Sequence, residues 1–313
     1  TSLLFAFCNS YSMHGKDHTM TNKIGLIGLG LVGTAIAESL LAQQFDVIGS
    51  DISPERCRQL EKSGGKSVSS PAEVAGRVEH VILSLPDTNA VLQVVEGPAG
   101  ILEAESLPTH IIDTTTGDPE ETMSLAKRLA ERGITFLDST ISGSSRQVRD
   151  REAVFMVGGD KAEFEKCSDV FSALAEKVFY VGPSGSGSKA KLASNLILGL
   201  NRLALAEGLV FAEKLGLDLK AFLELLKATP AYSTIMDTKG EKMVKANFAP
   251  QARVRQHHKD VALILKYAER AEQELPLSKT HLDVLEKSIA AGDADLDNAA
   301  IIKEIWRRTT RSK

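Results

Sequence analysis

Three glycines near the start of the chain constrain its fold more than any other feature. Gly28, Gly30 and Gly33 follow the apolar run Ile24–Gly28 and open the helical pattern of Val32–Ala42. In this arrangement the first glycine permits a tight turn, the second leaves the backbone bare, and the third lets helix and strand pack closely. The spacing therefore predicts a strand, a tight turn and a helix that packs back on the strand.

Strand and helix patterns continue to alternate as far as about residue 182. Several helical stretches begin with a capping residue followed by proline, as at Ser53-Pro54 and Asp118-Pro119. This alternation predicts an α/β fold with a Rossmann-type doubly wound sheet. The predicted strands are Ile24–Gly28, Val47–Ser50, Val81–Leu85, Ile111–Asp113, Thr135–Leu137, Val154–Val157 and Val178–Val181. The predicted helices here are Val32–Ala42, Pro54–Lys62, Pro71–Ala75, Pro119–Arg132 and Lys161–Ala175.

The strand pattern stops after Gly187. We therefore expect a Rossmann domain over residues 23–187 and an all-α C-terminal domain over residues 188–313, which begins with a long interdomain helix. Residues 1–22 fit neither pattern; we expect a disordered tail there, with a secretory signal as the alternative. The predicted C-terminal helices are Ser188–Leu215, Leu219–Ala228, Ala231–Ala246, Val254–Ala271, Leu277–Ala290 and Ala299–Arg308.

The glycine turn also suggests a ligand. Exposed N–H groups at a helix start attract phosphate, so a dinucleotide is expected on Gly28–Gly33, although a tight structural turn is the alternative. Asp51 ends the second strand pattern, 21 residues after Gly30. A carboxylate there accepts from ribose hydroxyls and repels a 2′-phosphate, which favours NAD over NADP. Arg56 weakens this preference, since it could contact a 2′-phosphate.

Two further strand ends lie where ligands of open α/β sheets bind. Leu85 and Pro86 end one strand pattern, and Thr116 closes the threonine run that follows another. We expect Leu85 on the adenosine side and a threonine hydroxyl on the nicotinamide ribose; ordinary loop capping is the alternative.

Lys191 and Asn195 carry the strongest indication of chemistry. They are four residues apart in the first turns of a long helix pattern, after the glycine-rich segment Gly182–Gly187, and so share one helical face. A lysine acts as a base near neutral pH when burial and nearby positive charge lower its pKa. A solvated surface lysine is the alternative, and we expect Lys189 to be one.

Two weaker features complete the candidates. The small residues of Asp138–Ser145 follow a strand pattern and expose N–H groups able to bind a carboxylate, with a plain turn as the alternative. His257 and His258 suggest a metal ligand pair, but adjacent helix positions face different ways, so we expect a solvated helix face and no metal.

Composition excludes several classes of partner. The chain has 313 residues, a net charge of −4 and three widely spaced cysteines. The charge gives no reason to expect nucleic acid, and no apolar run was found to approach the ~20 residues that span a bilayer. The cysteines suggest neither a disulfide framework nor a metal cluster, so we expect a reducing, cytoplasmic location.

Taken together, these segments resemble the β-hydroxyacid dehydrogenase family, which includes 3-hydroxyisobutyrate dehydrogenases and tartronate semialdehyde reductases. The resemblance covers about residues 23–300. Gly28–Gly33 is similar to the family's G-L-G-x-M-G turn, Asp138–Ser144 to its D-x-P-V-S-G-G substrate loop, Gly182–Asn195 to its G-x-x-G-x-G-x-x-x-K-x-x-N-N segment, and Lys259-Asp260 to its K-D pair.

The resemblance implies a role for each matching position. Lys191 would be the general acid/base, Asn195 would hold the substrate, and Lys259 would lie near the nicotinamide. It also implies a homodimer or homotetramer with a small hydroxy-carboxylate as substrate. The implied substrate loop residues are Ser142, Gly143 and Ser144, and the implied cofactor site comprises Gly28, Leu29, Gly30, Leu31, Val32, Gly33, Asp51, Leu85, Pro86 and Thr116.

The chain also departs from the family pattern. Ser144 adds a side chain in place of the second loop glycine, and Ser194 replaces the first asparagine of the N-N pair. Arg146, Arg149 and Arg151 follow the loop where relatives often carry small residues. These arginines suggest a more polar or more anionic hydroxy acid than 3-hydroxyisobutyrate.

The sequence therefore predicts an NAD-dependent oxidoreductase that interconverts a small 3-hydroxy acid and its semialdehyde. Two alternatives share the architecture: an imine reductase, which usually lacks the lysine, and a non-catalytic NAD(P)-binding module. The chain is short for a third, a decarboxylating 6-phosphogluconate-type enzyme.

Overall fold

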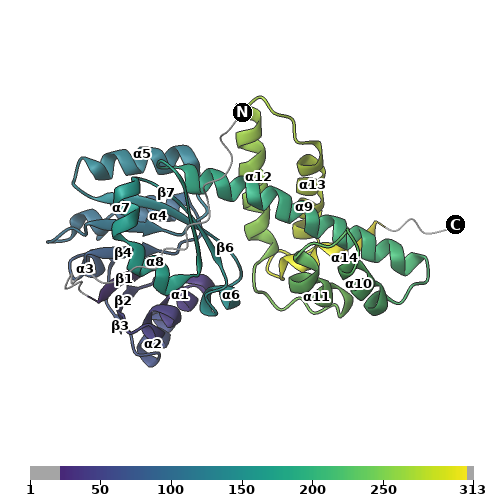
Figure 1. Cartoon of the computed structure of the whole chain (residues 1–313), viewed down its shortest axis with the longest axis horizontal. Coiled ribbons are helices and arrows are strands. Elements are labelled where there is room, and N and C mark those ends of the chain that lie inside the picture. The colour runs from purple at the N-terminus through teal and green to yellow at the C-terminus, as the bar shows by residue number, and fades with distance from the viewer. Residues whose placement is uncertain (1–21, 309–313) are drawn as a thin grey trace, which may run out of the picture.

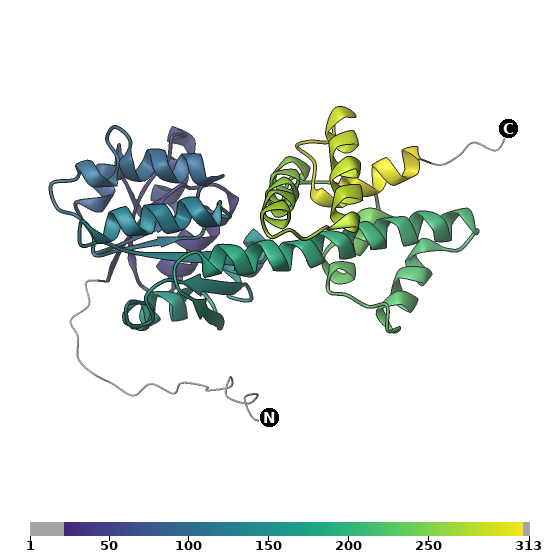
Figure 2. The ribbon, with the colours of Figure 1, turned by 90° about the horizontal axis from the view of Figure 1, so that it is seen from above.

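The computed structural model describes residues 22–308. They form two bodies joined by one long helix, α9 (Ser186–Lys214), which runs from one into the other (Figure 1, Figure 2). The tail predicted for residues 1–22 lies outside the described residues, apart from Asn22.

The N-terminal body is built on an eight-stranded sheet with the order β3-β2-β1-β4-β5-β6-β7-β8. Its strands are parallel from β3 to β6, whereas β7 runs antiparallel to β6 and β8 runs parallel to β7. The strands are β1 Lys23–Ile27, β2 Asp46–Ser50, β3 Lys66–Ser67, β4 His80–Leu83, β5 His110–Asp113, β6 Thr135–Ser142, β7 Val154–Gly158 and β8 Lys177–Gly182.

Helices cover both faces of this sheet because successive strand residues point to opposite sides. In β4, Ile82 packs with the cluster under α1 and α8, while Val81 and Leu83 pack with the cluster under α3, α4 and α5. The predicted Rossmann-type sheet is thus confirmed. The helices are α1 Leu31–Ala42, α2 Pro54–Lys62, α3 Pro71–Ala75, α4 Thr88–Glu96, α5 Pro119–Ala130, α6 Ser145–Arg149, α7 Lys161–Lys166 and α8 Ser168–Leu174, with a 3₁₀ turn at Ile101–Glu103.

The C-terminal body is helical throughout its described residues, as expected. α9 packs at its start against β6, β7 and β8, and along its remaining length against the other helices of this body (Figure 2). These are α10 Leu219–Lys227, a π-helix Met236–Gly240, α11 Glu241–Val244, α12 Val254–Arg270, α13 Pro276–Ala290, a 3₁₀ turn Asn298–Ala300 and α14 Ile301–Arg307.

Several predicted elements differ from the observed ones. β6 continues to Ser142, because Asp138–Ser142 pairs with β7 in register, so the predicted loop begins inside a strand. The predicted helix Lys161–Ala175 is broken at Cys167 into α7 and α8. Much of the predicted helix Ala231–Ala246 is a turn followed by the π-helix.

α9 deserves comparison with a membrane span, since its length and composition are sufficient for one. Half of its most apolar window is nevertheless buried inside the protein, and three polar residues of this helix, Lys191, Asn195 and Arg202, are buried as well. A helix packed against a sheet and other helices in this way is a core helix.

Candidate active site

The glycine turn leaves open space where an anion would approach. Gly28 has φ +93°, and a Cβ at Gly33 would overlap the carbonyl oxygen of Gly28, so both positions require glycine. A Cβ at Gly30, in contrast, would meet nothing within 4 Å. Gly30 is also the N-cap of α1 and supplies no side-chain cap. The start of α1 therefore fits a pyrophosphate group.

Asp51 ties this turn to the end of β2. Its Oδ2 accepts from the Leu29 N–H at 2.7 Å and its Oδ1 from the Ser53 N–H at 2.8 Å. Arg56 Nη1 lies 3.4 Å from Oδ2. The carboxylate that would face a ribose is therefore already held in place by the backbone.

Two exposed apolar side chains flank the turn. Leu31 is 50% exposed, and Ile52, directly after Asp51, is fully exposed. The sequence analysis did not single out Ile52. Apolar side chains beside a nucleotide turn suit the faces of a planar base.

Lys259 joins two other predicted cofactor positions, Pro86 and Thr116. From α12 its Nζ donates to the carbonyl of Thr116 at 2.7 Å and to that of Pro86 at 3.1 Å. The Leu85 N–H donates to Thr115 Oγ1 at 3.2 Å, which ties together the ends of β4 and β5. One cation from the helical body thus meets the carboxyl edge of the sheet.

Lys191 is buried at the junction of the two bodies. It is 8% exposed, and its Nζ has no hydrogen-bond partner among residues 22–308. Its pKa is lowered to about 8, chiefly by burial; Asp260 opposes this shift, and the positive charges of Arg202 and Lys259 contribute to it. Near neutral pH this amine can therefore exist in both protonation states.

Asn195 lies one turn further along α9 and is also buried. Its Nδ2 donates to Asp260 Oδ2 at 3.1 Å, and Asp260 Oδ1 lies 3.5 Å from Lys259 Nζ. Burial raises the pKa of Asp260, against the pull of Lys259 and Lys191. The predicted residues Lys191, Asn195 and Lys259 are thus assembled around one carboxylate.

Strand β6 fixes where α9 begins. Asp138 accepts from the Gly185 N–H at 2.9 Å through Oδ1 and from the Ser188 N–H at 2.8 Å through Oδ2. Gly185 has φ +86°. Asp138 was expected to begin a substrate loop; in the structure it caps the helix that carries Lys191.

The expected substrate loop lies at the end of β6. Ser142 is the last residue of β6. A Cβ at Gly143 would lie 2.8 Å from Ala153 Cβ. Ser144 forms a capping box with Gln147: its N–H donates to Gln147 Oε1 at 2.9 Å, and its Oγ accepts from the Gln147 N–H at 3.3 Å. Ser144 is therefore engaged in starting α6.

The three arginines after the loop serve local structure. Arg146 pairs with Asp150 and Arg149 with Glu38 of α1, while Arg151 Nη2 donates to the Ser172 carbonyl at 2.6 Å. They therefore give no support to the anionic substrate that they suggested.

The structure instead reveals a buried polar cluster that sequence reasoning missed. Arg202 of α9 is 3% exposed, and its Nε and Nη1 have no hydrogen-bond partner within the described chain. His257 of α12 and His281 of α13 pack against each other with ring centroids 5.0 Å apart and ring planes tilted by 48°, and their Nε2 atoms also lack partners there. The predicted solvated face is thus wrong for His257, which is 6% exposed.

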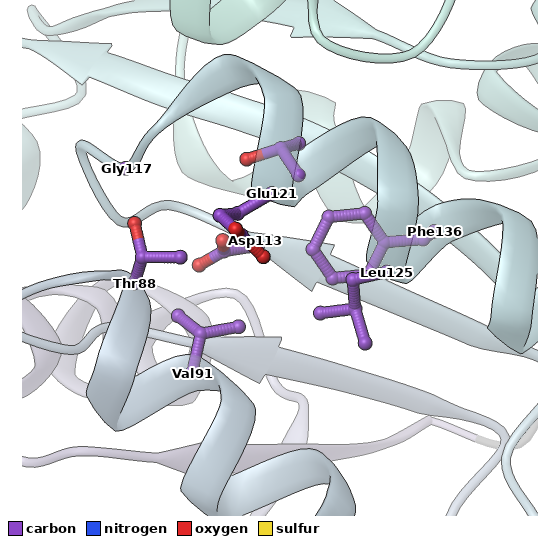
Figure 3. Close-up of a pocket in the computed structure, with 8 residues that line it drawn as sticks. Thr88, Val91, Asp113, Gly117, Glu121, Leu125 and Phe136 are labelled. Atoms are coloured by element: carbon purple, nitrogen blue, oxygen red, sulfur yellow. The ribbon is translucent and has the colours of Figure 1, made fainter.

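A small cavity lies elsewhere, beneath the β5–α5 loop (Figure 3). Asp113 and Glu121 direct polar atoms towards it, whereas the hydroxyl of Thr88, which also lines it, accepts from the Asp118 N–H at 2.8 Å. Burial raises the pKa of Asp113 to about 7. The cavity has a volume of about 10 Å³, which holds about one water molecule and no substrate.

Another group of possible metal ligands lies at the opposite edge of the sheet. His80, His110 and Cys167 are buried, with one ligand atom of each within 4.8 Å of the others. Both ring nitrogens of His110 are engaged, at 2.9 Å with Thr109 Oγ1 and at 2.9 Å with Glu163 Oε2. The sequence did not indicate this group, because its members are far apart along the chain.

Two families match consecutive parts of the chain. The NAD binding domain of 6-phosphogluconate dehydrogenase matches residues 23–182, and the family described as NAD-binding of NADP-dependent 3-hydroxyisobutyrate dehydrogenase matches residues 185–305.

Individual relatives agree with this match over almost the whole chain. 2-(Hydroxymethyl)glutarate dehydrogenase of Eubacterium barkeri is 32% identical, over 92% of this chain and 96% of that protein. 2-Hydroxy-3-oxopropionate reductase of Escherichia coli K12 is 31% identical, over 90% and 97%. The crystal structure of a 3-hydroxyisobutyrate dehydrogenase from Salmonella typhimurium superimposes with a TM-score of 0.83 at 25% identity, over 90% of this chain and 99% of that one.

Proposed function

The chain belongs to the β-hydroxyacid dehydrogenase family and is a nicotinamide-dependent hydroxyacid oxidoreductase; from this premise we propose that Lys191 is the general acid and base that interconverts a small 3-hydroxy acid and its semialdehyde. The observation that carries the proposal is the buried, unpaired amine of Lys191, whose pKa lies at about 8. An amine with that pKa is suited to move a proton near neutral pH.

The neighbouring residues support this role. The neutral amine of Lys191 accepts the hydroxyl proton during oxidation, and the protonated amine returns it during reduction. Asn195 donates one Nδ2 hydrogen to Asp260, which leaves its second Nδ2 hydrogen able to donate to the substrate hydroxyl oxygen while the hydroxyl proton passes to Lys191. When bound, the nicotinamide accepts or supplies the hydride.

The cofactor would lie along the carboxyl edge of the sheet. The open space at Gly30 fits the pyrophosphate, Asp51 the adenosine ribose, and Leu31 and Ile52 the adenine faces. NAD is the preferred cofactor in this proposal, because the Asp51 carboxylate repels a 2′-phosphate. Lys259 holds the Pro86 and Thr116 loops beside the nicotinamide end.

The substrate carboxylate would lie near the end of β6. In this proposal Ser142 and Gly143 bind the substrate carboxylate, since the Ser142 side chain has no hydrogen-bond partner in the described part of the chain. Ser144 contributes mainly by shaping this turn through its capping box.

The proposal also includes assembly and location. Exposed apolar side chains occur near the end of α9, in the turn after it and on α10, which supports a homodimer or homotetramer; they are Phe211, Leu215, Leu217 and Leu225. The described cysteines Cys57 and Cys167 are free thiols, as expected in the cytoplasm.

The decisive experiment replaces Lys191 and measures turnover. We expect Lys191→Ala to lower kcat by about 10²–10⁴-fold on the best substrate of a hydroxyacid panel, while NAD binding persists. Lys189→Ala is the matched control, since Lys189 lies two residues away and is exposed. Wild-type turnover in Lys191→Ala would exclude this base. NAD binding without turnover of any panel member by the wild type would favour the non-catalytic alternative.

A further inference from the structure

We propose that Arg202, together with His257 and His281, binds a second acidic group of the substrate, so that this enzyme acts on hydroxy acids carrying a distal carboxylate or another anion. The inference rests on the proposed function, because it places that group in the same interdomain site as Lys191.

The unpaired state of Arg202 is the first observation. A guanidinium is always charged and offers five N–H donors, and leaving such a charge buried without an acceptor is costly. Arg202 is 3% exposed, and no hydrogen bond joins it to any residue from 22 to 308. A ligand anion would supply the missing acceptors.

Of the two nearby carboxylates, Asp297 is fully committed to other donors, and Asp260 is committed through one of its oxygens. Asp297 accepts from Lys239 Nζ at 2.8 and 3.0 Å and from the backbone N–H groups of Gln251, Ala252 and Ala299. Asp260 accepts from Asn195 through Oδ2, whereas its Oδ1, 3.5 Å from Lys259 Nζ, has no hydrogen-bond partner in the described chain. Both attract Arg202 electrostatically without pairing with it.

The charge balance points the same way. Among the described residues, the cations Lys191, Arg202, Lys239 and Lys259 are coupled to the carboxylates Asp260 and Asp297, and Lys259 also to Asp113. The excess is two positive charges when Lys191 is protonated and Asp113, whose pKa is raised to about 7, is neutral. The carboxylate of a simple hydroxy acid would neutralise one of them. A second acidic group beside Arg202 would neutralise the other.

The geometry of α9 places this group on the substrate side. Lys191, Asn195, Gly199 and Arg202 follow at spacings of four, four and three residues, so they share one helical face. The Cα atoms of Lys191 and Arg202 lie about 16 Å apart along the helix, at about 1.5 Å per residue. Long helical side chains lean towards the N-terminus, so the Arg202 guanidinium leans back towards Asn195.

Gly199, which lies between Lys191 and Arg202 on α9, leaves room for the rings of His257 and His281. A Cβ there would lie 2.6 Å from His257 Nε2 and 2.7 Å from His281 Cε1, so only glycine lets both rings contact the helix. Burial lowers the pKa of His281 to about 4 and that of His257 well below its usual value, so both are neutral at physiological pH. Neutral imidazoles can donate to an anion without adding charge.

The test compares matched substrates. For 3-hydroxy acids whose side chain ends in a carboxylate or in a methyl group, we expect wild-type kcat/KM to favour the dicarboxylate by about tenfold or more. Arg202→Met should raise KM for the dicarboxylate about 10–100-fold and change that of the monocarboxylate by less than about threefold. Arg255→Met is the control, since Arg255 is exposed on α12 and pairs with Asp295. Equal losses on both substrates, or no wild-type preference, would overturn the inference.

A second measurement needs no variant. Glutarate should bind to the wild-type enzyme, with NAD present, at least about tenfold more tightly than butyrate in a calorimetric titration. Equal affinities would contradict the inference even if Arg202→Met does not fold. Failure of the proposed function is a distinct result, because it would appear as absence of turnover on every hydroxy acid.

Discussion

The glycine turn of the N-terminal body and the polar cluster of the helical body are specified in different ways. The turn depends on residues close together in sequence, Gly28, Gly30 and Gly33, with Asp51 holding them from the next strand. The cluster of Arg202, His257 and His281 comes from three helices that meet only after folding. A cofactor shared by many enzymes can be recognised by a local motif, whereas a substrate particular to one enzyme is contacted by residues scattered along the chain.

The largest expected effect distinguishes two glycines within the turn. A side chain at Gly33 overlaps the Gly28 carbonyl, so Gly33→Ala should lower the free energy of unfolding by more than about 3 kcal/mol. Gly30→Ala, where a Cβ meets nothing, should leave stability nearly unchanged and weaken cofactor binding. Chemical denaturation and NAD titration measure the two effects, and similar stabilities of the two variants would refute this division.

Two glycines of α9, Gly199 and Gly208, allow the corresponding comparison in the helical body. Gly199→Ala pushes against His257 and His281 and should destabilise the protein by about 1–3 kcal/mol. A Cβ at Gly208 meets nothing within 4 Å, so Gly208→Ala should stabilise the helix by about 0.5–1 kcal/mol. Thermal unfolding of both variants would show opposite shifts in Tm. Shifts of the same sign would mean that the rings do not pack on Gly199.

Asp51 tests how far the turn selects its cofactor. We expect Asp51→Asn to change the ratio of the KM values for NAD and NADP about tenfold in favour of NADP, since one negative charge near the 2′ position is lost. Glu55→Gln, at the nearby start of α2, is the control. An unchanged ratio would show that Asp51 only supports the turn through Leu29 and Ser53.

The smallest expected effect connects the cluster with the base. Because the neutral amine of Lys191 is the active form in the proposed oxidation, kcat should rise with pH up to about 8 and then level off, while kcat for reduction should fall above about 8. Arg202 lowers the pKa of Lys191, so Arg202→Met should move this inflection to higher pH. An unchanged inflection in Arg202→Met would show that Arg202 does not influence the pKa of the catalytic base.

Much of the fold could be predicted because its signals are local. The glycine turn, the capping residues and the alternation of apolar runs indicated the sheet, and the spacing of Lys191 and Asn195 placed them on one helical face. The end of β6 was misplaced because polar residues such as Asp138 and Ser139 interrupt its apolar run, although both are buried in the sheet.

The site could be predicted only where residue type and spacing carry information. Arg202 and His281 are single polar residues within helical patterns, where a solvated position is the usual expectation. Nothing local shows that they turn inwards. The arginines after the substrate loop gave the opposite error, since Glu38 and Ser172, the partners of Arg149 and Arg151, lie far away in sequence.

The 29-residue helix α9 has a consequence for substrate length. Asp138 anchors the start of this helix to the sheet, and within the helix the span from Lys191 to Arg202 is set by the number of residues between them, at about 1.5 Å per residue. Moving the arginine by one turn would change that span by about 5.4 Å, roughly four carbon–carbon bonds. The helix therefore fixes the distance between the two proposed substrate contacts. A related enzyme with a cation at another turn of this helix would be suited to longer or shorter acids.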